Sequence, residues 1–256
     1  MEMSDHRDLS EELKNLVIVV GHFVKPYFTT QYSVKEHSIE MRIDHVAYRV
    51  VRPNHALAHG LRQSVLAVKI VQLLIVEKPL HPMSQWFREQ LEAPNNDFLF
   101  KVAMVAAFQR TGRQSEIGHN MDPCLYKKYI QSDSKNFRRE AWKYQDNFTS
   151  EEEVSFYADA LNWPLKEHRN YLEILLSVSH KADLRRILSF DGTRIRKMIL
   201  EELHGYPPSV TDEIWSISGH HLEATGDRDL VVKRTYQPTF FLLANDPGTI
   251  VDRLWK

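Results

Sequence analysis

Two histidines stand four residues apart in the stretch RPNHALAHGLRQSVLAVKIVQLL, which covers residues 52–74. Apolar residues recur every three or four positions through this stretch, so it is predicted to be a helix with His55 and His59 on one face. Such a pair suits a zinc ion, as in the H-E-x-x-H motif, but Ala56 follows His55 where that motif carries its general base. From these residues alone, the pair can bind a metal, act on a phosphate or line a protein core, and all three interpretations stay open.

A metal-dependent phosphohydrolase of the HD type is one alternative, because those enzymes are also built from helices. They require an adjacent His-Asp pair and a later Asp as metal ligands. The sequence has Asp44-His45 in the reverse order, and His180 and Asp183 are separated by two residues. The ligand pair on which this chemistry depends is therefore missing from the sequence.

Two further polar segments interrupt apolar stretches. TGRQSEIGHN places Arg113 and Glu116 just after a strongly apolar segment, and SVSHKADLRRIL places His180 and Arg186 within another. Burying such groups without partners costs several kcal/mol each, so they are expected to meet one another or a ligand. The simplest interpretation is an ion pair at a helix end and a hydrogen-bonded core histidine, and the alternative is a binding site.

The order of these segments resembles a known family. RPNHALAHGLR, GRQSE, SHKADLRR and ATGDR occur in that order, and the first three are similar to the motifs N-H-G-x-x-H-x-x-R, G-R-x-x-E and H-x-x-D-L. Those motifs are typical of the phosphodiesterase (PDE) domain of the SidE family of Legionella effectors and of the related stand-alone deubiquitinases. The resemblance runs from about residue 15 to the end of the chain, and it implies an all-helical fold.

In that family two histidines and a glutamate act without a metal or another cofactor. The resemblance implies that His55 is the catalytic histidine that attacks phosphorus, that Glu116 orients it, and that His180 is the general acid. It also implies a substrate-binding pocket for the phosphate, lined by Asn54, His59, Arg62, Arg113 and Arg186.

The implied mechanism agrees with the chemistry of these side chains. A phosphodiester is anionic, so guanidinium groups must spread the charge that develops during attack. A neutral His55 can form a transient phosphohistidine while Glu116 accepts a hydrogen bond from its other ring nitrogen, and a protonated His180 can donate to the leaving oxygen. The implied substrate is ADP-ribosylated or phosphoribosylated ubiquitin, and the alternative is a catalytically reduced module that binds AMP or a related nucleotide.

Two departures from the family pattern bear on that choice. Ser177 stands three residues before His180, where the family has an asparagine in the phosphate pocket. Only residues 181–256 follow His180, which suggests that the additional helical lobe that grips ubiquitin is reduced or absent. We therefore expect a single phosphodiesterase-like domain over residues 1–256.

Composition narrows the function further. The 256 residues include 33 basic and 34 acidic ones, and a net charge of -1 argues against a general nucleic-acid-binding protein. Cys124 is the single cysteine, so no intramolecular disulfide can form and a reducing compartment is expected. The apolar runs fall short of the ~20 residues that span a bilayer, so no membrane span is expected. A monomer is expected, and the resemblance implies a bacterial cytoplasmic protein that a type IV system secretes into a host cell.

The elements that must position these residues are predicted to be helices. Long stretches of 3.6-residue periodicity and only nine glycines predict an all-α, compact helical domain. Ser10 is expected to cap the first helix, Ser150 and Glu153 to form a capping box, and residues 25–50 to contain a short hairpin. Helices are predicted at residues 9–23, 54–76, 84–93, 97–112, 123–144, 150–163, 168–191 and 211–224.

Overall fold

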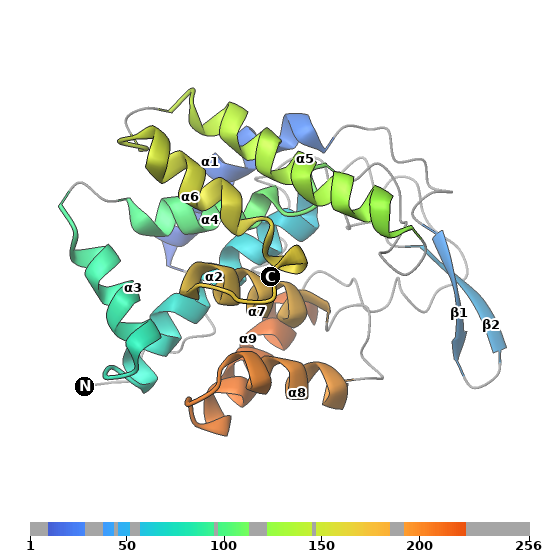
Figure 1. The fold of residues 1–256 in the computed structure, drawn as a ribbon. Coiled ribbons are helices and arrows are strands. Elements are labelled where there is room, and N and C mark those ends of the chain that lie inside the picture. The colour runs from blue at the N-terminus through green and yellow to red at the C-terminus, as the bar shows by residue number, and fades with distance from the viewer. Residues whose placement is uncertain are drawn as a thin grey trace.

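The computed structural model describes residues 10–28, 38–43, 46–51, 57–94, 97–112, 122–144, 147–184 and 192–223. Over these residues the chain is helical almost throughout, with one two-stranded sheet (Figure 1). The elements run in the order α1 (Glu11–Val24), η1 (Lys25–Tyr27), β1 (Ser38–Ile43), β2 (Val46–Val51), α2 (Leu57–Glu77), α3 (Pro82–Glu92), α4 (Phe98–Phe108), α5 (Pro123–Ala141), α6 (Glu151–Ala160), η2 (Trp163–Leu165), α7 (Tyr171–Asp183), α8 (Gly192–Glu202) and α9 (Pro208–Glu223). The predicted all-α, compact helical fold is confirmed.

The central helix of the fold is α2, which packs against α1, α3, α4, α7 and α9. Every residue from Leu57 to Val71 is buried, so this part of α2 is enclosed on all sides. By length and apolar composition α2 also resembles a membrane-spanning helix, but 83% of its most apolar window is buried inside the protein. That burial is what the innermost helix of a packed core shows.

The helix α4 is shorter than predicted, because it ends at Phe108 rather than at Gly112. Arg110 has a φ of 77°, in the left-handed region, which cannot continue a right-handed helix. The backbone N–H groups of Arg110 and Gly112 instead donate to the carboxylate of Asp133 on α5, at 3.0 and 2.6 Å. A side chain from another helix therefore fixes the turn that follows α4.

Helix caps lie largely where the sequence predicts them. Ser10 accepts a hydrogen bond from the Leu13 N–H at 3.2 Å. The expected capping box at Ser150 is only half formed, because Ser150 accepts from the Glu153 N–H but the Glu153 carboxylate does not return to the Ser150 N–H. Glu153 Oε2 instead accepts from the backbone N–H of Thr149, one residue earlier, at 2.8 Å, and Oε1 accepts from the Lys101 ammonium at 2.6 Å. Lys101 is buried, and Glu153 provides the carboxylate partner that its charge requires.

The region after α7 differs from the prediction of one helix over residues 168–191. The described helix α7 ends at Asp183, and a separate helix, α8, begins at Gly192. Ile195 and Ile199 of α8 are buried at four-residue spacing, so α8 presents an apolar face to α7 and α9. Within residues 25–50, where a hairpin was predicted, β1 pairs with β2 in antiparallel register, and β2 extends to Val51.

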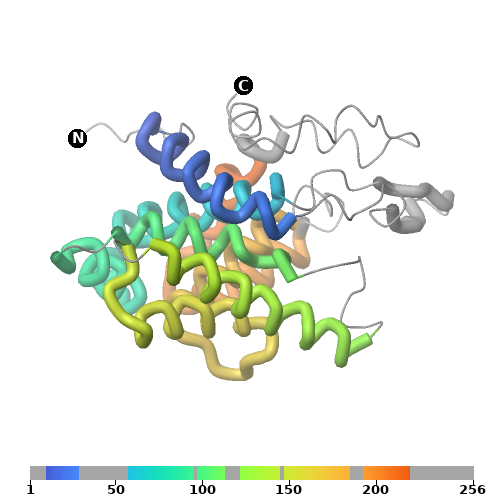
Figure 2. The backbone as a smooth tube through the Cα atoms, turned by 90° about the horizontal axis from the view of Figure 1, so that it is seen from above, coloured from blue at the N-terminus to red at the C-terminus, as the bar shows by residue number. Residues whose placement is uncertain are grey.

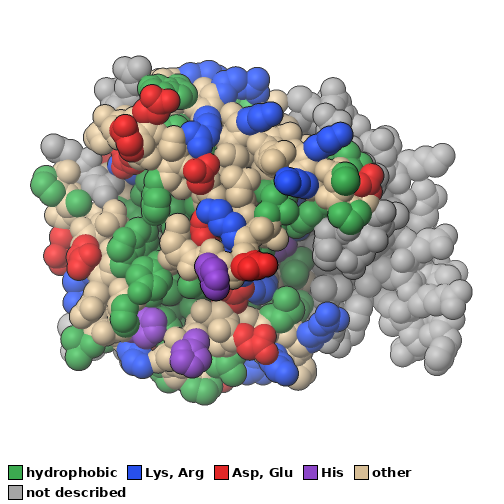
Figure 3. Space-filling view, viewed as in Figure 1, with side chains coloured by type: hydrophobic (Ala, Val, Ile, Leu, Met, Phe, Trp, Pro, Cys, Tyr) green, Lys and Arg blue, Asp and Glu red, His purple; other side chains and the backbone are tan. Residues whose placement is uncertain are grey.

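The helices α5, α6 and η2 lead the chain to α7 and place Trp163 beside it. α5 and α6 run side by side (Figure 2), and the short helix η2 leads from α6 toward α7. Trp163 of η2 thereby lies with its ring centroid 5.9 Å from that of His180 on α7. On the face shown in Figure 3, acidic and basic side chains are interspersed, in agreement with the balanced composition.

Candidate functional site

Three of the eight predicted site residues lie within the described part of the chain, namely His59, Arg62 and His180. The structure brings these three together at the contact between α2 and α7, although more than a hundred residues separate His180 from the others. The remaining five, Asn54, His55, Arg113, Glu116 and Arg186, lie outside the described residues.

The contact between α2 and α7 is built on a buried carboxylate, Asp183. His59 Nδ1 donates to Asp183 Oδ2, and Arg62 Nε donates to Asp183 Oδ1 at 2.7 Å. All three side chains are essentially inaccessible to solvent. The carboxylate therefore neutralises Arg62 in the interior and fixes a proton on Nδ1 of His59. Asp183 belongs to the H-x-x-D-L pattern, but no role was predicted for it.

A second bridge between the same helices is made by the Gln63 side-chain amide. One terminal atom of this amide lies 3.0 Å from His59 Nε2 and also 2.7 Å from His180 Nδ1. The two imidazole rings are nearly perpendicular, with their centroids 5.6 Å apart. Gln63 is one helical turn after His59, so the i, i+4 spacing that suggested His55 and His59 as a pair also joins His59 to Gln63.

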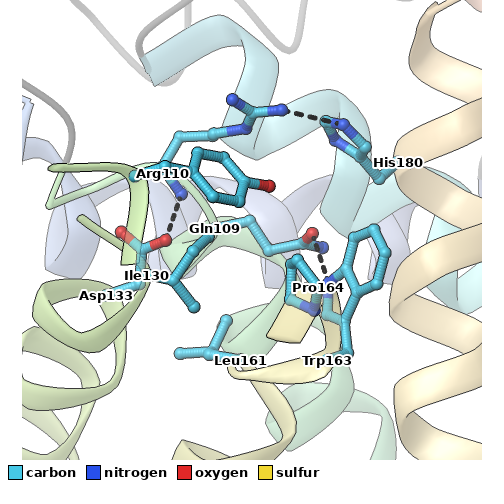
Figure 4. Close-up of a pocket in the computed structure, with 9 residues that line it drawn as sticks. Gln109, Arg110, Ile130, Asp133, Leu161, Trp163, Pro164 and His180 are labelled. Carbon is cyan, nitrogen blue, oxygen red and sulfur yellow. Dashed lines mark hydrogen bonds between the residues drawn. The ribbon is translucent and has the colours of Figure 1, made fainter. Parts of the chain in front are cut away.

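Arg110 reaches His180 from the turn after α4, although sequence analysis did not single it out. Its Nη2 lies 2.9 Å from His180 Nε2 (Figure 4). The left-handed backbone of Arg110 is held by Asp133, which also accepts from the hydroxyl of Thr111 at 3.3 Å. Uncommon backbone conformations of this kind persist only where the surroundings determine them, and they occur often at functional sites.

Asp133 itself is a buried carboxyl with three donors around it. Burial raises the pKa of Asp133 from 3.8 to about 7, and the hydrogen bonds from Gly112 and Arg110 oppose that rise. The clamp on the turn at Arg110 is therefore held by a group that titrates near neutral pH.

A small pocket, partly open to solvent, adjoins His180 and Arg110. Ile130, Leu161 and Trp163 line its apolar side, and Gln109 lies between them and Arg110 (Figure 4). The indole Nε1 of Trp163 donates to Gln109 Oε1 at 3.2 Å.

Ser177 lies in a different environment from the one the family pattern suggests. Its hydroxyl contacts Glu202 and Lys181 at 2.9 Å each and Arg169 at 3.2 Å. Burial lowers the pKa of Lys181, although Glu202 opposes this. Ser177 therefore belongs to a polar cluster that joins α7 to α8.

No group of three or more His, Cys, Asp or Glu side chains arranged to hold a metal ion occurs within the described ranges. Both ring nitrogens of His59 contact protein groups, Asp183 and Gln63. The same holds for His180, between Gln63 and Arg110. The described part of this site therefore consists of imidazole, guanidinium, amide and carboxylate groups in direct contact.

Comparison with models of known protein families finds a match over most of this chain. The model of the SidE phosphodiesterase (PDE) domain matches residues 26–232. No curated protein matches the chain significantly.

Solved structures of similar fold come from Legionella pneumophila. Two show the C-terminal domain of lpg1496: one is 18% identical with a TM-score of 0.62, and the other, in complex with nucleotide, is 17% identical with a TM-score of 0.61. Each comparison covers 98% of this chain and 96% of the other. The crystal structure of the uncharacterized protein lpg1496 is 16% identical with a TM-score of 0.60, over 99% of this chain and 69% of the other. At these identities the likeness shows a shared fold.

Proposed function

This chain belongs to the SidE phosphodiesterase (PDE) domain family, and from that premise we propose that it is a metal-independent phosphodiesterase. Its substrate would be the phosphodiester or pyrophosphate linkage of ADP-ribosylated or phosphoribosylated ubiquitin. The observation that carries the proposal is the convergence of His180 and Arg110 at one pocket, with a proton-transfer group beside a guanidinium. By analogy with Legionella relatives, the protein would act in a host cell after type IV secretion.

The described residues have distinct roles in the proposed reaction. Arg110 would bind an anionic phosphate oxygen, since a guanidinium stays charged and offers several N–H donors. His180 would donate a proton to the leaving oxygen. His55 as the nucleophile, which forms the phosphohistidine, and Glu116 as its partner stay predictions.

His59 and Arg62 were predicted to line the phosphate pocket. The contacts described for them are with Asp183 and Gln63 inside the α2–α7 contact. We propose that they hold α2 against α7 and so keep His180, which lies on α7, in position. Direct contact with phosphate stays a prediction for both residues.

A second candidate function is nucleotide binding without turnover. Its support is Ser177, which is buried in the cluster with Lys181 and Glu202, whereas the family has a phosphate-pocket asparagine at that position. A related solved structure is a complex with nucleotide. A pocket that lacks one phosphate ligand can keep its affinity for a nucleotide and lose its catalytic power.

Incubation of the purified protein with ADP-ribosylated ubiquitin, with and without EDTA, tests these functions against one another. AMP release that persists in EDTA supports the phosphodiesterase, and AMP binding without release supports the nucleotide-binding module. Release that stops in EDTA supports a metal-dependent phosphohydrolase of the HD type instead.

Histidine variants identify the reacting groups in the same assay. His55→Ala and His180→Asn are expected to abolish AMP release. His22→Asn, at an exposed position on α1, is the matched control and should keep the wild-type rate. Wild-type turnover by His55→Ala would remove His55 as the nucleophile.

A further inference from the structure

His180 has a nitrogen donor at one side of its ring and the Gln63 amide at the other. Arg110 Nη2 lies 2.9 Å from Nε2 of the ring, and the end of the Gln63 amide lies 2.7 Å from Nδ1. A guanidinium only donates hydrogen bonds, so Nε2 must present its lone pair to Arg110. A neutral imidazole carries one proton, and that proton is therefore on Nδ1.

The Gln63 amide must then face His180 with its oxygen, because an N–H group on the ring needs an acceptor. The oxygen and nitrogen of a side-chain amide are distinguished by their partners. The atom between the two histidines lies 3.0 Å from His59 Nε2 as well, and the other amide atom has no hydrogen-bond partner among the described residues. The environment of His180 therefore decides the orientation: the bridging atom is Oε1.

This orientation also determines the state of His59. Its Nδ1 donates to Asp183, and Oε1 of Gln63 at its Nε2 requires a second proton there. His59 is then a fully buried imidazolium ion, and it shares the single carboxylate of Asp183 with the Arg62 guanidinium.

We infer that Gln63 is a positioning residue that, together with Arg110, assigns the protons of both histidines. Its carbonyl oxygen holds the Nδ1–H of His180 and the Nε2–H of His59. The Nε2 atom of His180, on the side of Arg110 and the pocket, is then the one position that gains and loses a proton. In the described elements, the polar and charged groups that face His180 are Gln63 and His59 from α2, Arg110 from the turn after α4 and Trp163 from η2.

The catalytic part of this inference rests on the proposed function. Nε2–H of protonated His180 would break as the leaving oxygen takes the proton, and the attack of water on the phosphoryl group would return a proton to Nε2. Arg110 donates to Nε2 only when that nitrogen is unprotonated. Once Nε2 carries its proton, the guanidinium would turn to an anionic oxygen of the substrate.

Nitrogen NMR of protein labelled with 15N-histidine tests the proton assignment without any turnover. His180 signals are identified by their loss in His180→Asn. In wild type, the neutral His180 is expected to carry its proton on Nδ1 and to leave Nε2 bare. Gln63→Met keeps the size of the side chain without the acceptor. Arg110 still favours a bare Nε2, but the Nδ1–H then lacks its acceptor, so part of the neutral His180 population should change to the Nε2–H form.

Gln63→Glu keeps an acceptor and adds a negative charge. The Nδ1–H form should persist, and the titration midpoint of His180 should move upward by about one pH unit. Gln85→Glu is the matched control, because it makes the same chemical change at an exposed position on α3, and it should alter neither property.

Kinetics with ADP-ribosylated ubiquitin separate a positioning role from a structural one. Gln63→Met is expected to lower kcat about tenfold or more with little change in KM, and Gln63→Glu to keep kcat within a few-fold while its pH profile moves upward. A wild-type neutral ring protonated at Nε2, or an unchanged Nδ1–H form in Gln63→Met, would overturn the inference. If the wild-type protein releases no AMP, the proposed function fails while the NMR result still decides the proton assignment.

Discussion

Replacing Asp183 by asparagine should destabilise the protein strongly, because its carboxylate is the shared acceptor of two buried donors. The Arg62 guanidinium is 1% exposed and Asp183 is 0% exposed, with 2.7 Å between Nε and Oδ1. The asparagine side chain would keep one acceptor oxygen, but its amide nitrogen would face the N–H of either Arg62 or His59. Leaving a buried charge without its partner costs about 3–5 kcal/mol, a large share of the stability of a typical domain.

The chain offers a matched control for this substitution. Arg138 and Asp159 form an ion pair at the same 2.7 Å separation, but their side chains are 35% and 56% exposed. Asp159→Asn makes the same chemical change in the same kind of pair, and it should cost less than about 1 kcal/mol because water screens exposed charges. The difference between the two substitutions therefore isolates the effect of burial.

Urea unfolding followed by circular dichroism measures both free energies of unfolding. A double variant, Arg62→Met with Asp183→Asn, extends the test, because removing the buried cation should recover part of the loss and reveal an interaction free energy of about 2 kcal/mol. Asp183→Asn as mild as Asp159→Asn, or strict additivity with Arg62→Met, would refute the description of Asp183 as the anchor of the α2–α7 contact.

Three further predictions follow from the site and from the core beside it. Burial raises the pKa of Asp133 from 3.8 to about 7, so the folded protein binds this proton more tightly than the unfolded chain does. The stability that the bound proton contributes is complete below pH 3.8 and is lost as pH rises to about 7. The stability of wild type relative to Asp133→Asn should therefore fall by about 3 kcal/mol between pH 5 and 8, measured by urea unfolding. Arg110→Gln should lower kcat/KM for AMP release about 100-fold while the unfolding midpoint changes little, and a normal rate would remove Arg110 from phosphate binding. Gly60→Ala should cost about 1–3 kcal/mol in urea unfolding, because its Cβ would lie 2.7 Å from the Ala107 carbonyl oxygen on α4, and wild-type stability would contradict that close helix contact.

Part of the site could be predicted and part could not. Motif order singled out His59, Arg62 and His180, and the structure places these three together, although their catalytic and binding roles stay predictions. Gln63 and Asp183 were missed because buried polar residues within an apolar helix look alike in sequence whether they bridge another helix or not.

The sequence by itself determined the helices, since periodic burial and local caps such as Ser10 depend on residues only a few positions apart. It did not determine where α4 ends, because the acceptor that stops it, Asp133, comes from a helix that begins later in the chain. Tertiary structure alone also decided that Arg110 reaches His180. A proton's position on an imidazole depends on which donors and acceptors surround the ring, and those partners meet only when distant helices pack together.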